Sequence, residues 1–84
     1  MKLMNKSLYS HRQITLQRLL REFRLKAGLR QEDVAQAIDE PQSFVSKIES
    51  GERRLDLLEL REVCLAMGIT LAKFVAVLES RLAD

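Results

Sequence analysis

Three glycines and a single proline divide this chain into short segments, and their placement limits what it can fold into. Gly28, Gly51 and Gly68 each follow a stretch of helical periodicity, where the left-handed residue that ends a helix is expected. Pro41 falls between two short helical patterns and marks the start of the second. The sequence carries no β-hairpin turn signal and no internal repeat. We therefore predict an all-α fold, a compact bundle of five helices.

Apolar residues recur with helical spacing inside each segment. Ser10 and Gln13 match a capping box, which predicts that the first helix begins after Ser10. Asp56 and Thr70 are the expected caps of the last two helices. The five helices are expected at about residues 11–27, 31–38, 42–50, 57–67 and 71–82. Their apolar positions, and hence the predicted core, are Leu16, Leu19, Leu20, Phe23, Ala27, Val34, Ala35, Ile38, Val45, Ile48, Leu57, Leu60, Val63, Cys64, Met67, Leu71, Phe74, Val75, Leu78 and Leu82.

The length of 84 residues fits one domain. We expect a flexible N-terminal arm over residues 1–9 and a helix-turn-helix domain over residues 10–84. No apolar run approaches the roughly 18–20 residues that cross a bilayer, and the basic start has no apolar stretch behind it. We therefore expect a cytoplasmic protein with no membrane partner.

The net charge of +2 hides an asymmetry along the chain. Residues 1–30 hold eight Lys and Arg against Glu22 alone, a balance of +7, whereas residues 31–84 have a balance of −5. Such polarity favours an anionic partner on one side of the molecule. An ordinary solvated charged surface explains the same numbers.

The two short helices predicted over 31–38 and 42–50 are joined by three residues, which is the geometry of a helix-turn-helix. In that motif one helix braces across the DNA backbone while the next enters the major groove. Burial of Val45 and Ile48 would leave polar side chains on the outer face of the second helix. These are Gln42, Ser43, Ser46 and Lys47. The spacing also fits an ordinary solvated helix face.

A longer pattern makes the motif more specific. Residues 25–38 (LKAGLRQEDVAQAI), 41–51 (PQSFVSKIESG) and 53–56 (RRLD) closely resemble the Cro/CI-type (XRE) helix-turn-helix family of transcriptional regulators. The resemblance runs from about Leu16 to Leu78, some three-quarters of the chain. It implies a lambda-repressor-like DNA-binding domain that binds double-stranded DNA.

The resemblance also assigns roles to individual residues. It implies that Gln31 bonds a DNA phosphate and that Gln42 contacts a base, with adenine the favoured partner of a glutamine amide. The further groove-facing positions are Ser43, Ser46 and Lys47, and the positions that follow the DNA backbone are Arg53 and Arg54. Ala35 matches a small residue where the two helices pack closely.

Arg24 and Glu49 match positions that often form a partly buried ion pair between the first and third helices. Arg24 could instead be a DNA-facing cation and Glu49 a surface charge. A glutamate on a DNA-binding helix is repelled by phosphate unless it is neutralised, which favours the pair.

The chain departs from the family pattern around the motif. Arg30 replaces the usual cap of the second helix, which predicts a weaker cap, and Asp39 replaces the usual glycine of the turn. Glu40 and Pro41 precede the third helix, and a carboxylate there is unfavourable near phosphates. Phe44 lies at an outward position, where it either packs against the fourth helix or touches a thymine methyl group.

An enzyme is not expected, and neither is a cofactor, a metal or a small-molecule substrate. His11 is the single histidine, and Cys64 lies on an apolar stripe.

The alternative function is a protein-interaction module or an antitoxin-type partner built on the same fold. The apolar stripe of the last helix, with Val77 beside it, exceeds what one small core requires, so we expect a homodimer through that helix. The predicted function is a repressor that binds a palindromic operator.

Overall fold

The computed structural model describes the backbone of residues 6–83 and the side chains of residues 11–83. Within this part of the chain the secondary structure is helical and contains no strand. The helices are α1 (Lys6–Lys26), α2 (Gln31–Ala37), α3 (Gln42–Ser50), α4 (Leu57–Ala66) and α5 (Leu71–Leu82). The predicted all-α fold of five helices is therefore confirmed.

The start of α1 differs from the prediction. The helix begins at Lys6, so Ser10 lies inside it and its expected capping box with Gln13 does not mark a helix end. No glycine or proline occurs between Lys6 and Lys26, so nothing in the backbone interrupts the helix. Residues 6–9 of the predicted arm are helical, and residues 1–5 lie outside the described residues.

The helix ends follow the predicted signals. The glycine after α1, the one after α3 and the one after α4 all have positive φ, at 74°, 88° and 79°. A Cβ at Gly51 would meet only the end of the Gln17 side chain from α1, which can move aside, so the positive φ is what favours glycine there. At the start of α4 the Asp56 carboxylate accepts a hydrogen bond from the Glu59 backbone N–H (2.7 Å), and the Glu59 carboxylate accepts one from the Asp56 N–H (3.0 Å). This reciprocal pair is a capping box.

The core gathers apolar side chains from all five helices. The buried ones are Leu19, Leu20, Val34, Ala35, Val45, Ile48, Val63, Cys64, Met67 and Phe74. Three predicted core residues are exposed instead, Ala27, Leu57 (64%) and Val75 (36%). Val77 packs against the core from α5, which turns Val75 outward, and Leu55 packs there from the loop before α4. The sequence therefore predicted most of the inward residues of α4 and α5 correctly, but it chose Leu57 where Leu55 packs and Val75 where Val77 packs.

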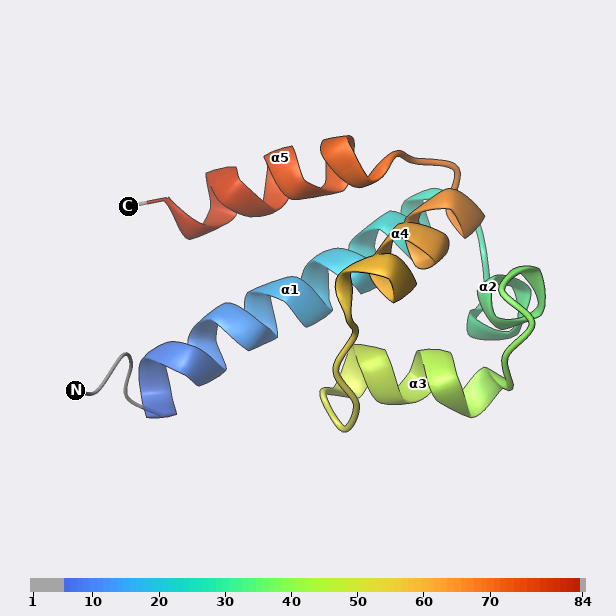
Figure 1. Ribbon diagram of the computed structural model, residues 1–84, viewed down its shortest axis with the longest axis horizontal. Coiled ribbons are helices and arrows are strands. Elements are labelled where there is room, and N and C mark those ends of the chain that lie inside the picture. Colours follow the sequence, from blue (N-terminus) through green and yellow to red (C-terminus); the bar gives the residue numbers. More distant parts are fainter. Residues whose placement is uncertain (1–5, 84) are drawn as a thin grey trace.

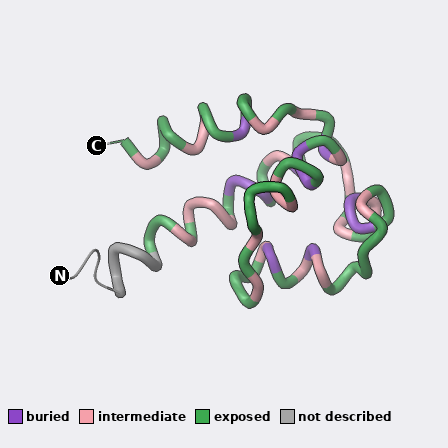
Figure 2. Tube along the Cα trace, in the orientation of Figure 1, coloured by how far each residue is buried: buried purple, intermediate pink, exposed green. Residues whose placement is uncertain are grey.

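The long helix α1 organises the rest (Figure 1). It contacts α3 along one side and α5 along another, while α2 packs against α3 and α4. Buried segments gather where these helices meet, and the outer turns of every helix are exposed (Figure 2). This arrangement buries the inward row of α3 and leaves its opposite face free.

No single helix of the described residues is long and apolar enough to cross a membrane. By length and composition only α4 and α5 together meet that criterion, and they are bent by 106° at the break between them. In the fold both helices pack their apolar rows against the common core.

Candidate nucleic-acid interface

The turn between α2 and α3 sets the angle between these two helices. Asp39 has a φ of 58° and is the residue other than glycine with a positive φ in the described chain. The Glu40 N–H donates to the carbonyl of Ala35 (2.9 Å), which closes the end of α2. Ala35 is itself 2% exposed and belongs to the core, so the carbonyl that closes α2 lies on a buried residue with no side chain beyond Cβ. Asp39 thus supplies the left-handed conformation that a glycine would otherwise provide.

The start of α2 is capped in an unusual way. Arg30 stands at the N-cap, and its side chain accepts no hydrogen bond from the helix. Asp33 compensates because its carboxylate accepts hydrogen bonds from the Arg30 backbone N–H (2.8 Å) and from the Arg30 guanidinium (3.0 Å). These contacts lower the pKa of Asp33. The weaker cap expected from the sequence is therefore partly restored by Asp33, a partner the sequence reasoning did not identify.

The outer face of α3 brings the predicted base-reading residues together. Val45 and Ile48 are buried, so the face on the other side of the helix carries the polar residues. Gln42, Ser43 and Lys47 are exposed there and Ser46 is half-buried. Amide, hydroxyl and ammonium groups in one row provide donors and acceptors that suit base edges and phosphates.

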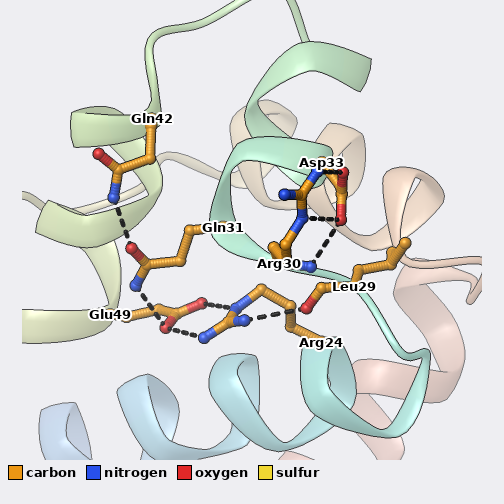
Figure 3. A network of polar contacts seen from close by, with 7 residues as sticks. All are labelled: Arg24, Leu29, Arg30, Gln31, Asp33, Gln42 and Glu49. Atoms are coloured by element: carbon orange, nitrogen blue, oxygen red, sulfur yellow. Dashed lines mark hydrogen bonds and ion pairs between the residues drawn. The ribbon is translucent and has the colours of Figure 1, made fainter.

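A chain of hydrogen bonds runs from this face into the protein (Figure 3). The Gln42 amide donates to Oε1 of Gln31 (2.7 Å), and the Gln31 amide donates to Oε1 of Glu49 (3.1 Å). The first link joins α3 to α2 and the second joins α2 back to α3. Gln31 and Gln42, predicted separately as a phosphate contact and a base contact, are therefore held side by side. The sequence contained no signal for this contact, because the two residues lie eleven positions apart on different helices.

Glu49 is the inner end of that chain. Arg24 of α1 donates to it from Nε (2.6 Å to Oε2) and from Nη2 (2.9 Å to Oε1), and the two side chains are 9% and 8% exposed. The remaining nitrogen, Nη1, donates to the carbonyl of Leu29 (2.9 Å). The hydrogen bond to Glu49 raises the pKa of Arg24, against the opposing effect of burial. The structure thus places Arg24 inside the scaffold rather than on the DNA-facing surface.

Arg53, predicted to follow the DNA backbone, is held by contacts within the protein. Its guanidinium carbon lies 4.5 Å from the centroid of the Phe44 ring. The same group forms a bidentate pair with Glu59, at 3.1 Å and 2.8 Å. Together with the Asp56 backbone, this pair lowers the pKa of Glu59 to about 2. Phe44 is half-buried against the core, so of its two predicted roles the structure supports packing.

The basic residues of the first thirty positions do not gather on α3. Arg24 and Arg30 are engaged in ion pairs with Glu49 and Asp33. Among residues 11–26 of α1 the exposed cations are Arg12, Arg18, Arg21 and Lys26. The positive charges at α3 come from Lys47 within it and from the two arginines of the loop that follows. The charge asymmetry along the sequence therefore does not by itself locate the interface.

Comparisons with known proteins agree with this geometry. A family model described as helix-turn-helix matches residues 20–74, more than half of the chain. The chain is similar to the structure of an XRE-family like protein from Pseudomonas syringae pv. tomato str. DC3000, with a TM-score of 0.84 and 36% identity over 92% of this chain and 94% of that one. Among curated proteins no sequence matches.

Two further solved structures share the fold. One is the clp gene regulator ClgR from C. glutamicum, with a TM-score of 0.75 and 25% identity over 86% of this chain and 94% of that one. The other is the restriction-modification controller protein C.Esp1396I, a tetramer in complex with its natural 35 base-pair operator, with a TM-score of 0.75 and 22% identity over 82% and 91% of the two chains. The family match and the 36% identical relative together show that this chain belongs to the XRE-type helix-turn-helix family of DNA-binding transcriptional regulators.

Proposed function

We propose that the protein reads a specific DNA sequence by inserting α3 into the major groove, and that it represses transcription by occupying an operator in a promoter. The observation that carries this proposal is the pair formed by Gln31 and Gln42 on the outer side of the motif. A free glutamine side chain samples several rotamers, and fixing it on binding costs conformational entropy. The hydrogen bond to Gln31 reduces that cost at the position best placed to contact a base.

In this proposal Gln42 contacts a base edge, with adenine as the favoured partner. Ser43, Ser46 and Lys47 contact bases or phosphates further along α3. Gln31 bonds a phosphate from the start of α2, where the exposed backbone N–H groups also favour an anion. Arg53 and Arg54 lie beside the DNA backbone after α3, with Arg53 held in place by Phe44 and Glu59.

We propose further that the protein binds as a homodimer to a palindromic operator, with two recognition helices about 34 Å apart. The controller protein that shares this fold is assembled as a tetramer on its operator, so the fold is compatible with assembly on DNA. The sequence placed the dimer contact on α5. Most of the large apolar side chains of α5 pack against the core, and Val75 is the one that is exposed by 36%.

Selection of bound sequences from a random pool of DNA duplexes tests the proposal. We expect enrichment of two inverted half-sites whose centres are one helical turn apart, and binding that weakens steeply as salt is raised. A purified protein that shows no salt-dependent DNA binding would exclude the proposal and favour the protein-interaction alternative. Enrichment of a single half-site without symmetry would exclude the palindrome and the dimer while leaving DNA recognition in place.

A further inference from the structure

The outer face of α4 carries leucines that the fold does not cover. Leu58 is 74% exposed and Leu65 is 49% exposed, whereas Val63 and Cys64 on the same helix are buried. Leu58 and Leu65 are seven residues apart, which is about two turns, so they lie one above the other on the side away from the core. Figure 2 shows this alternation of exposed and buried segments along α4. Exposed leucines that share one side of a helix offer apolar surface to another molecule.

Two opposite charges flank this pair of leucines. At about 100° per residue, Arg61 lies about 50° to one side of the line that joins the leucines and Glu62 about 50° to the other. Both side chains are exposed, by 55% and 63%, and the contact between them is a long one of 3.9 Å. We call the four residues Leu58, Arg61, Glu62 and Leu65 the leucine face. It has an apolar centre, a positive edge and a negative edge.

We propose that the leucine face joins two copies of this chain, with α4 packed against α4 across a two-fold axis. The inference rests on the homodimer of the proposed function and names its contact. When two such helices run parallel, each leucine meets the same leucine of the second copy. The two-fold axis then brings the positive edge of each copy against the negative edge of the other, so Arg61 lies opposite the partner's Glu62 on both sides.

The charges also favour the parallel arrangement of the two α4 helices over the antiparallel one. In an antiparallel pair the two-fold axis would place the positive edges together and the negative edges together. Like charges that face one another are destabilising, whereas opposite charges in those positions set the partner and the orientation. A second copy in the parallel orientation therefore matches the charges of the leucine face.

The leucine face also explains the surplus of apolar residues in the second half of the sequence. The sequence assigned that surplus to α5, but the structure turns Leu71, Phe74 and Val77 of α5 toward the core. Among the described apolar side chains the two largest exposed fractions are those of Leu58 (74%) and Leu57 (64%), both on α4, and Leu25 of α1 follows at 55%. More of the exposed apolar surface thus lies on α4 than on α5.

Sedimentation velocity over a range of protein concentrations, without DNA, tests the inference. Arg61→Glu and Glu62→Arg each replace two favourable pairs by two repulsive ones, so each variant should raise the dimer dissociation constant by about tenfold or more. The double variant Arg61→Glu/Glu62→Arg exchanges the edges and should restore dimerisation. An equimolar mixture of the two single variants should form a heterodimer, because every edge then meets its opposite.

Leu58→Ser should also dissociate the dimer, and its exposure means that the fold should survive, which circular dichroism checks. Val75→Ser on α5 and Leu25→Ser on α1, at positions 36% and 55% exposed, are the matched controls and should leave dimerisation unchanged. The inference is overturned if the wild type stays monomeric at every concentration, if the double variant does not recover, or if Val75→Ser dissociates the dimer while Leu58→Ser does not.

The same samples separate this inference from the proposed function. A wild type that dimerises through α4 but binds no DNA would leave the contact in place and remove the DNA-binding function. A wild type that binds DNA as a monomer would remove the contact and leave α3 as the reading helix.

Discussion

Arg24 of α1 and Glu49 of α3 form a bidentate ion pair in which both side chains are less than a tenth exposed. A buried charge without a partner is costly, so each residue requires the other. Glu49 also accepts a hydrogen bond from Gln31, which in turn accepts one from Gln42. The pair that fastens α1 to α3 is therefore also the anchor of the proposed reading residues, which links the stability of the scaffold to the geometry of the DNA-facing surface.

The first prediction concerns that pair. Glu49→Ala leaves Arg24 buried with one remaining acceptor, the carbonyl of Leu29, and should lower the free energy of unfolding by about 3 kcal/mol. For a domain of this size that corresponds to a fall in Tm of roughly 12–24 °C, measured by thermal denaturation. Glu52→Ala, in the exposed loop after α3, is the control and should change Tm little. An unchanged Tm for Glu49→Ala would contradict the energetic role of the pair.

The second prediction concerns base reading. Gln42→Ala should weaken binding to the selected operator by about 1–3 kcal/mol and relax the preference at one base position in each half-site. Binding to unrelated duplexes should change little, because a base contact contributes little there. Fluorescence anisotropy with the operator and with single-base variants measures both effects, and Ser80→Ala on α5 serves as the control. Equal weakening on every sequence would show that Gln42 does not read a base.

The third prediction separates the two loop arginines. Arg54→Ala should weaken all DNA sequences alike and reduce the slope of log K against log salt by about 1, as expected for one lost phosphate contact. Arg53→Ala should lower Tm relative to the wild type, because Arg53 binds Glu59 and stacks on Phe44. A salt titration and a thermal scan of both variants measure the difference, with Arg21→Ala on α1 as the control. A Tm of Arg53→Ala equal to that of the wild type would contradict the structural role of Arg53.

Much of this fold could be predicted from the sequence because the residues that begin and end its helices act locally. The left-handed residues after α1, α3 and α4 and the cap of α4 depend on neighbours within a few positions. The start of α1 was wrong because Ser10 can cap a helix but does not compel one to begin, and nothing before it stops the helix. The inward faces of α4 and α5 were partly wrong because the choice between Val75 and Val77 depends on how α5 crosses α1 and α4.

The candidate site also has a part that could be predicted from the sequence and a part that could not. The outer face of α3 follows from helical spacing, since burial of Val45 and Ile48 fixes which side of the helix is free. The partners of the site residues do not follow from spacing. The contact of Arg53 with Glu59 and that of Gln31 with Gln42 join different segments, and no feature of a single sequence identifies them. Such contacts depend on the tertiary arrangement of the helices.

The fourth prediction concerns the turn of the motif. Asp39 has a φ of 58°, a conformation that costs a typical residue with a side chain about 1–2 kcal/mol and glycine very little. Asp39→Gly should therefore leave the stability unchanged or slightly raised, whereas Asp39→Val should lower it by about 1–2 kcal/mol or more because valine is β-branched. Denaturant unfolding measures both. Glu40→Val, at the neighbouring exposed position without a positive φ, is the control, and equal losses at the two positions would contradict strain at Asp39.

The fifth prediction concerns acid. Glu59 has a pKa of about 2 in the folded protein against an ordinary value of 4.5, because Arg53 and the Asp56 backbone N–H bind its ionised form. A lowered pKa in the folded state means that the contribution of Glu59 to stability is complete above about pH 5 and is lost as the pH falls from 4.5 toward 2. Glu59→Gln should therefore lower Tm at pH 7, and the difference in Tm from the wild type should shrink over that interval.

Thermal scans of both proteins between pH 7 and pH 2 measure this difference, which removes the contribution of every other carboxylate that the two proteins share. Glu79→Gln on α5 is the matched control, since Glu79 is exposed and forms no ion pair among the described residues. Its Tm at pH 7 should differ little from that of the wild type. Glu59 joins the cap of α4 to the arginine of the loop that follows α3. A Tm difference for Glu59→Gln that does not change with pH would show that this contact does not hold the loop in solution.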